Sequence, residues 1–224
     1  MHIPDGMING GTAVGSGALS LSAVSVSLVA ARRWLQERQV PLIGMSAAFL
    51  LVIQSVVHVP LGPGLDGHLI GGALVAILLG PWLGLLVVAA VALVETTGFG
   101  YGGVVALGAN IALGLVAVVG GYALFRSLIV ILPKTRSGFL AASAVTAWVT
   151  VVITGAVGSA MVTYGGLFGA AQARLFIPPI VLGHGLIGIA EAVITAAAVR
   201  AVMAARPDLM ATRALLPQPA QARM

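Results

Sequence analysis

The chain has 224 residues, of which 59% are hydrophobic and only 8% charged, and its mean hydropathy is +1.10. Because a soluble domain carries roughly 25% charged residues, this composition excludes a soluble globular domain and predicts an integral membrane protein. The net charge of +5 does not indicate nucleic-acid binding, because the basic residues lie between apolar segments. The lack of cysteine excludes disulfides, thiolate metal sites and iron–sulfur clusters.

The apolar segments predict an all-α polytopic membrane protein with seven transmembrane helices, each bounded by glycine, proline or charge. Long apolar runs without a ten-residue alternation favour helices over a β-barrel. Segments three and four are short for a span of roughly 20 residues and flank the break Gly80-Pro81-Trp82. The seven segments are expected at about 12–31, 42–59, 69–79, 83–96, 104–125, 139–157 and 176–203. Residues 1–224 are interpreted as a single membrane domain with a polar, loosely ordered tail at 207–224.

The basic residues predict the orientation of these helices. Seven crossings with the N-terminus outside place ten of the eleven basic residues in the cytoplasm, in agreement with the positive-inside rule. The ten are Arg32, Arg33, Arg38, Arg126, Lys134, Arg136, Arg200, Arg206, Arg213 and Arg223, and Arg174 is the exception. This topology places residues 1–10 and the loop at 60–68 together on the external face, and the 207–224 tail in the cytoplasm.

The first six residues, Met-His-Ile-Pro-Asp-Gly, form a candidate metal-binding segment. No lysine or arginine precedes Arg32, so the basic region of a signal peptide is missing and we expect the chain to begin at Met1. The amine of Met1, the amide nitrogen of His2 and the imidazole of His2 are spaced to close adjacent chelate rings on one divalent ion. Residues 1–10 are therefore predicted to be an external metal-binding segment that lacks a fourth ligand.

Three further histidines compete for that fourth position: His58, His68 and His184. His68 is favoured because it follows Gly67 in the loop expected to face the N-terminus, where glycine lets the backbone approach closely. His58, at the outer end of the second segment, is the rival ligand. Four nitrogen donors suit Ni²⁺ or Co²⁺, whereas Mg²⁺ prefers oxygen.

Several other polar residues lie within or near the expected spans. His184 and Glu191 are two helical turns apart and share one helix face, and Glu95 and Asn110 also lie close to apolar runs. Ionisable groups in a membrane are costly and are functional candidates, although hydrogen bonds that tie helices together are the favoured role for Glu191. With no nucleotide-binding loop, no metalloprotease motif and no serine–histidine–acid pattern, the chain is not expected to be an enzyme.

Four stretches together resemble the CbiM/NikM family, the substrate-binding S components of energy-coupling factor (ECF) transporters for cobalt and nickel. They are the opening hexapeptide, residues 67–74 with 79–82, residues 106–110 and residues 184–192. The resemblance covers the chain to about Met203. It implies a six-helix S-component core with one extra N-terminal helix, and a metal held by Met1, His2 and His68.

The resemblance also implies partners and a task. A transmembrane coupling protein, two ATPase subunits and a small accessory membrane protein are expected, in a bacterial cytoplasmic membrane. The transported substrate is expected to be Co²⁺ or Ni²⁺, with no organic cofactor. We lean towards cobalt, for cobalamin biosynthesis, because no accessory domain is fused to the chain. The alternatives are a nickel-specific S component and a proton-coupled secondary metal transporter that uses Glu95, His184 and Glu191.

Two positions depart from the family pattern beside the expected site. Asp66 stands where the family often has serine, and Tyr101 stands where it often has aspartate. The second asparagine that usually follows Asn110 is also missing. None of these is an expected ligand, so the departures affect the surroundings of the metal and its ion preference.

Overall fold

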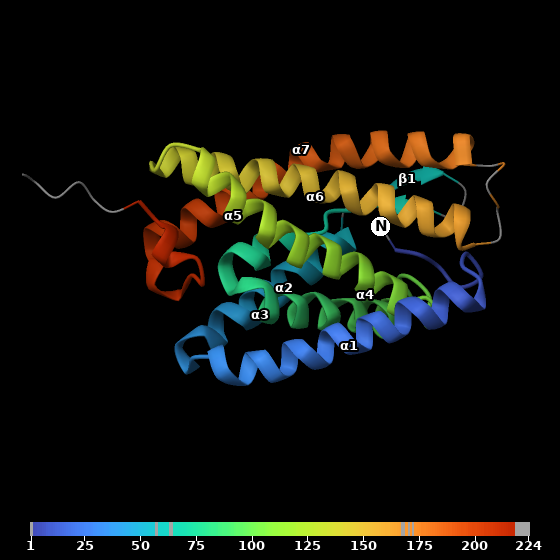
Figure 1. The fold of residues 1–224 in the computed structure, drawn as a ribbon, viewed down its shortest axis with the longest axis horizontal. Helices are drawn as coiled ribbons and strands as arrows, with labels where there is room; N and C mark the ends of the chain where they lie inside the picture. The colour runs from blue at the N-terminus through green and yellow to red at the C-terminus, as the bar shows by residue number, and fades with distance from the viewer. Residues whose placement is uncertain are drawn as a thin grey trace, which may run out of the picture.

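The computed structural model describes residues 2–56, 58–62, 65–166, 169, 171 and 173–217. Its helices lie roughly along one long axis, with α1 on one side of the bundle and α6 and α7 on the other (Figure 1). The helices are α1 (Gly10–Trp34), α2 (Val40–Val56), α3 (Gly72–Val94), α4 (Leu107–Leu115), α5 (Gly121–Ile131), α6 (Arg136–Tyr164) and α7 (Ala173–Ala205). A hairpin of β1 (Val59–Gly62) and β2 (Leu65–Gly67) joins α2 to α3.

Within the described ranges, six helices are long and apolar enough to cross a membrane. They are Gly10–Arg33, Glu37–Val56, Gly72–Phe99, Leu107–Ile131, Arg136–Tyr164 and Ala173–Ala205. π-Helical turns extend α3 through Glu95–Phe99 and join α4 to α5 through Val116–Gly120. The helical membrane class is therefore confirmed, but the structure has six long helices where the sequence predicts seven.

The difference arises in α3, which unites the expected segments three and four. Gly80 lies inside this element with φ 80° and ψ 173°, outside the helical region, and Pro81 follows it. A Cβ on Gly84 would lie 3.2 Å from the Val75 carbonyl, whereas nine residues of straight helix span about 13.5 Å. The two parts of α3 therefore run back along each other from Gly80. Seven crossings and an external N-terminus stay predictions.

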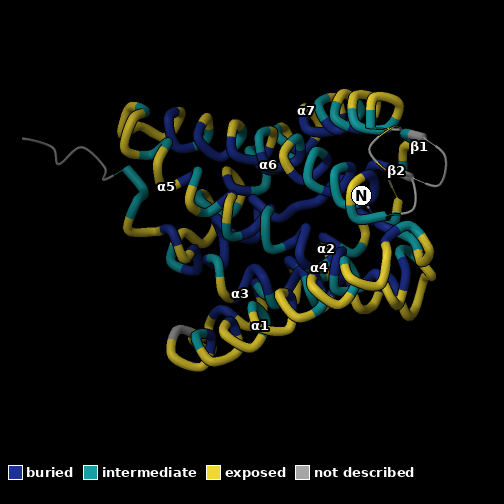
Figure 2. Tube along the Cα trace, turned by 45° about the vertical axis from the view of Figure 1, so that its right-hand side comes forward, coloured by how far each residue is buried: buried dark blue, intermediate teal, exposed yellow. Residues whose placement is uncertain are grey.

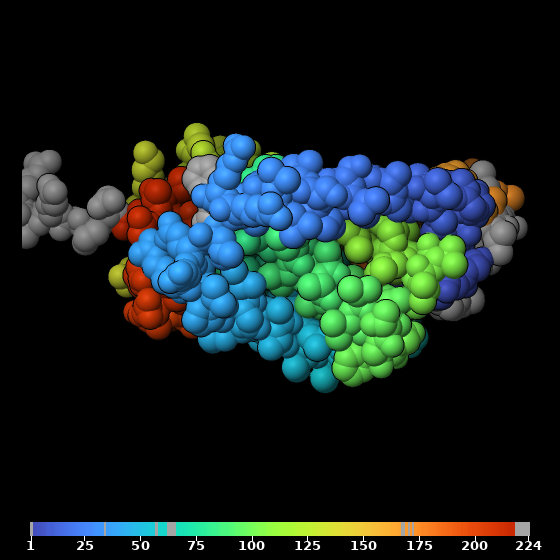
Figure 3. All heavy atoms as spheres, turned by 90° about the horizontal axis from the view of Figure 1, so that it is seen from below, coloured from blue at the N-terminus to red at the C-terminus, as the bar shows by residue number. Residues whose placement is uncertain are grey.

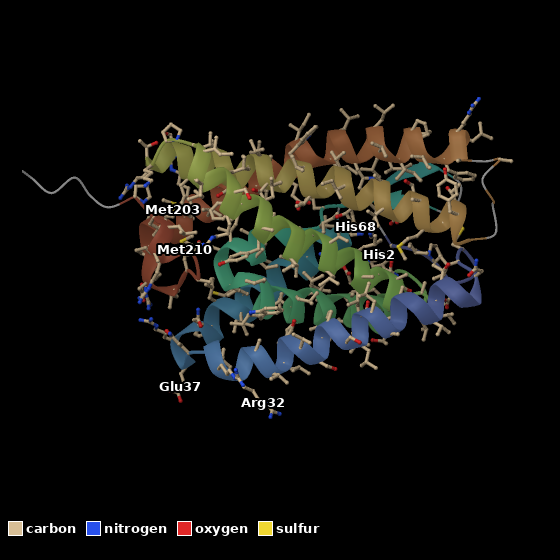
Figure 4. The ribbon with its side chains drawn as sticks, in the orientation of Figure 1. His2, Arg32, Glu37, His68, Met203 and Met210 are labelled. Carbon is tan, nitrogen blue, oxygen red and sulfur yellow. The ribbon has the colours of Figure 1, made fainter. Side chains whose placement is uncertain are left out.

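Residues 211 and 212 form hydrogen bonds to the backbone at this break. The expectation of a loosely ordered tail is therefore wrong for residues 207–217. The Ala211 N–H donates to the Leu78 carbonyl over 2.8 Å, and the Thr212 hydroxyl donates to the Ile77 carbonyl over 2.9 Å. The break frees these two carbonyls from helical partners. Leu209, Met210 and Thr212 are buried here, and Met210 lies at the end of the bundle away from His2 (Figure 4).

The buried and exposed residues follow the pattern of a bundle in lipid. α3 is buried along most of its length, whereas the outer faces of the surrounding helices are exposed (Figure 2). Those faces are apolar, with Val14 and Leu21 on α1 and Leu182 and Val193 on α7 all more than half exposed. Large exposed apolar surfaces are typical of a contact with membrane or protein.

Helix α1 lies along the surface of the bundle over α3 and α4 (Figure 3). Its approach to α4 is close because two glycines meet: a Cβ on Gly108 would lie 2.5 Å from the Cα of Gly17. The Ser20 hydroxyl donates to the Gly108 carbonyl over 2.6 Å. Small residues at such crossings let backbones pack tightly and gain van der Waals contact.

We expect Gly108→Ala to push α1 away from α4 and to destabilise the protein by about 1–3 kcal/mol, as overpacking does in well-packed cores. Thermal unfolding of the purified protein in detergent measures this. Gly15→Ala is the matched control, because a Cβ there would meet no described atom within 4 Å beyond the neighbouring residues and backbone of its own helix. Equal melting temperatures for the two variants would show that the α1–α4 crossing does not need a glycine.

Candidate metal centre

The segment before α1 enters the bundle, and His2 and Ile3 are both buried. Asn110 on α4 pairs with the backbone of Ile3: its Oδ1 accepts from the Ile3 N–H over 2.8 Å, and its Nδ2 donates to the Ile3 carbonyl over 3.1 Å. The Gly103 N–H also donates to that carbonyl over 3.0 Å. The buried backbone N–H and carbonyl of Ile3 thereby have hydrogen-bond partners, although Ile3 belongs to neither a helix nor a strand.

Asp5 fixes the other end of this segment. Its carboxylate accepts from the N–H groups of Val104, Val105 and Ala106, over 3.0, 2.8 and 3.1 Å, in the turn that leads into α4. Acidic groups are favourable at this position because the helix dipole is positive there. A side chain on Gly103 would overlap Asp5, so glycine is required at that turn.

His2 is oriented by the carboxylate of Glu95, a residue predicted from the sequence only as part of the alternative proton path. Its Nε2 lies 3.0 Å from Oε2 of Glu95, and the Glu95 side chain is fully buried. Among the described residues, Nδ1 of His2 is buried without a hydrogen-bond partner. A carboxylate on one ring nitrogen sets the tautomer and leaves the lone pair of the other nitrogen for a metal.

His68 follows β2 and lies against His2 (Figure 4). The two rings stack with centroids 4.2 Å apart and planes inclined by 22°. Nδ1 of His68 donates to the Leu69 carbonyl over 2.7 Å, which sets its tautomer as well. Burial is the main cause that lowers the pKa of His68 well below its ordinary value, because the charged ring would lose its hydration. The ring is therefore neutral and suited to bind a cation at neutral pH.

Glu191 holds the residues that follow His68. Its two carboxylate oxygens accept from the N–H of Ile70 over 2.6 Å and of Gly71 over 2.8 Å, at the start of α3. From α2, the Gln54 side chain donates to the Ile70 carbonyl over 2.7 Å. Glu191 therefore ties α7 to α3, which confirms the favoured role of interior hydrogen bonding.

The remaining candidate ligands differ in where they lie. His58 lies near the site, with its ring 6.2 Å from that of His2 and 5.7 Å from that of His68. His184 instead packs on Gly155, and its Nδ1 donates to the Ile180 carbonyl of its own helix over 2.8 Å. Met1, whose amine is a predicted ligand, lies outside the described residues. The assignment of Met1, His2 and His68 as ligands stays a prediction.

A cavity of about 30 Å³ lies against His2 and His68, enough for one water molecule. Its polar lining comes from four helices or their extensions: Gln54, Glu95, Asn110 and Thr154. A cavity of about 470 Å³ lies at the opposite end of the bundle, beside Gly80 and Met210. No histidine lines it, so it offers no comparable nitrogen donors.

The fold and the paired histidines define a class: a helical membrane protein with two stacked imidazoles buried in its bundle. Residues 2–209 match the family model described as CbiM, cobalt uptake substrate-specific transmembrane region, and the chain belongs to this family. It is thus a membrane component of cobalt or nickel transport of the CbiM/NikM type.

Individual relatives agree with this assignment. The cobalt transport protein CbiM of Sorangium cellulosum is 31% identical over 225 residues, which cover 94% of each chain. A protein of Archaeoglobus fulgidus assigned to nickel transport, the fused NikMN, is 31% identical over 215 residues, 96% of this chain and 69% of the relative. The crystal structure of a truncated transition metal transporter matches with a TM-score of 0.78 and 26% identity, over 91% of this chain and 99% of that one.

We expect Glu191→Ala to destabilise the protein by about 1–3 kcal/mol, because two buried N–H groups lose their acceptors. Glu191→Gln, which keeps one acceptor oxygen, should lose less. Thermal unfolding in detergent compares the variants, with Val193→Ala on the exposed face of the same helix as control. If Glu191→Ala melts with the control, Glu191 does not hold the start of α3.

Proposed function

We propose that this chain is the substrate-binding component of an ECF-type importer that captures Co²⁺ or Ni²⁺. The observation that carries the proposal is the buried pair of His2 and His68, stacked at 4.2 Å, with the Nδ1 of His2 lacking a hydrogen-bond partner within the described part of the chain. A buried imidazole nitrogen without a partner is costly unless a ligand completes it. In this proposal the transported ion binds Nδ1 of His2.

In this proposal the ion is held by nitrogens. The Met1 amine, the backbone nitrogen and Nδ1 of His2, and a ring nitrogen of His68 form a set of four donors. Asn110 and Asp5 support the set by fixing the backbone on either side of Pro4, so that the chain start is held in the bundle. Nitrogen donors select borderline transition metals over Mg²⁺ and Ca²⁺.

Transport in this proposal depends on other subunits. A transmembrane coupling protein and two ATPase subunits drive the reorientation that delivers the ion, and a small accessory membrane protein assists. Transport in a bacterial cytoplasmic membrane would supply cobalt for cobalamin biosynthesis. A nickel-specific component is the runner-up, since both ions accept this donor set.

The alternative of a proton-coupled transporter that acts alone has less support. It requires Glu95, His184 and Glu191 to exchange protons along a path. Both oxygens of Glu191 accept backbone N–H groups, and Oε2 of Glu95 accepts from His2. Carboxylates held in this way orient other groups, so we favour the subunit of a larger importer.

We expect a residue added before Met1 to abolish Co²⁺ and Ni²⁺ binding while the protein stays folded, because the extension turns the amine into an amide. His68→Ala should also lose the ion. The measurement is the metal content of the purified protein after incubation with each ion, with the melting temperature as the test of folding. An extension after Met224 is the matched control. Unchanged binding by the N-terminally extended protein would refute the proposed site.

We expect Glu95→Ala to weaken metal binding about 10–100-fold, as is typical when the carboxylate behind a metal-binding histidine is removed. Calorimetric titration with Co²⁺ measures the affinity. Glu37→Gln, which removes an acidic group at the other end of the bundle (Figure 4), controls for the change in net charge. Equal affinities in both variants would mean that Glu95 does not position His2.

A further inference from the structure

A second group of potential ligands lies beside the buried histidines. Ligand atoms of His2, His58 and Asp66 all lie within 4.8 Å of one another. The side chains of His58 and Asp66 are 23% and 33% exposed, whereas that of His2 is 8% exposed. The exposed fraction therefore falls from Asp66 through His58 to His2, so the three groups lead from the surface to the buried site.

The β-hairpin positions this group. Strand pairing sets Val59 opposite Gly67 and Pro60 opposite Asp66, so His58 and Asp66 come from neighbouring ends of the two strands. His68 follows directly after β2. One short hairpin thus supplies both a buried histidine and two partly exposed groups, and no rearrangement of helices is needed to bring them together.

His58 and Asp66 lie near each other without a good hydrogen bond. Nε2 of His58 is 3.5 Å from Oδ2 of Asp66, longer than the 2.7–3.2 Å or so of a typical hydrogen bond. The same nitrogen is buried with no hydrogen-bond partner in the described ranges. A metal ion with bonds of about 2.0–2.2 Å holds adjacent ligands roughly 3 Å apart. The pair therefore has nearly the spacing that a shared cation imposes.

Tyr101 packs against His58. The two rings meet edge to face with centroids 4.5 Å apart, and Tyr101 also stacks on Phe99. The Tyr101 ring therefore packs against one side of this group.

We propose that His58 and Asp66 form an entry site for the divalent ion, through which it passes to and from the buried nitrogens of His2 and His68. The inference rests on the proposed function, because it concerns the same ion. Transfer is an exchange of ligands: the ion keeps its charge, and imidazole nitrogens replace water, the carboxylate and His58. The carboxylate attracts the hydrated ion, and His58 replaces part of its hydration before the ion reaches His2.

An intermediate site has a kinetic signature. It lowers the barrier in both directions, so its loss slows association and dissociation by the same factor and leaves the dissociation constant unchanged. Simple electrostatic attraction by Asp66 would act on association alone. A role of His58 as a permanent ligand would weaken the equilibrium affinity and change the absorption spectrum of bound Co²⁺.

The test is stopped-flow mixing of the detergent-purified full chain with Co²⁺, followed by chelator-induced release. His58→Gln, Asp66→Asn and the double variant are compared with the unmodified protein. We expect each single variant to slow both rates by about tenfold or more, within the range of electrostatic and site effects on association. The double variant should be little slower than either single one, because the two residues act as a unit.

One control accompanies these variants. Glu37→Gln removes one acidic charge, as Asp66→Asn does, but at the far end of the bundle (Figure 4). It should bind and release Co²⁺ at the unmodified rates. Unchanged rates for His58→Gln, a change in association alone, or a changed Co²⁺ spectrum at saturation would each overturn the entry site while the proposed function stands. If the unmodified protein binds no Co²⁺ or Ni²⁺, the proposed function fails as well.

Discussion

The structure depends on how a stretch of polar backbone is accommodated inside an apolar bundle. Residues 2–5 have no helix to satisfy their N–H and carbonyl groups, and a bilayer offers no water to do so. The Asn110 amide and the Gly103 N–H provide partners for the backbone of Ile3, and the Asp5 carboxylate binds the turn before α4. These bonds fix the position of the segment, and therefore the position of His2.

Two buried carboxylates support the two histidines of the candidate metal centre. Glu95 accepts from His2, and Glu191 accepts from two N–H groups next to His68. An isolated buried carboxylate is strongly unfavourable, but charge-assisted hydrogen bonds offset much of that cost. Glu95 orients the imidazole of His2, and Glu191 holds the backbone that follows His68. The two carboxylates thus have supporting roles around one candidate site.

The apolar outer surfaces and the break at Gly80 belong to the membrane-spanning part of the molecule. A helix that stops and reverses leaves carbonyls without partners, which is tolerated at membrane depth only where protein supplies donors. The Ala211 N–H and the Thr212 hydroxyl supply them from the end of the chain. Residues 211 and 212 are therefore part of the fold, far from the candidate metal centre in space and sequence.

Local signals in the sequence determined the membrane class, the helical segments and the hexapeptide that precedes them. Apolar runs, glycine and proline act over one or two turns, so α1, α2, α6 and α7 lie close to their expected ranges. The loop position of His68 beside Gly67 predicted it as the companion of His2, the family resemblance implied the same residue, and the two rings do meet. The terminal amine remains a prediction, since Met1 lies outside the described residues.

Only the tertiary structure decided how the polar residues pair. Glu95 lies 93 residues from His2, Asn110 lies 107 from Ile3, and Glu191 lies 121 from Ile70. No periodicity links such positions, because helix packing brings them together. The same holds for the reversal of α3, since a glycine–proline pair predicts a break but not the direction that follows. Hydropathy places residues in the membrane, and close packing of the helices then selects each polar partner.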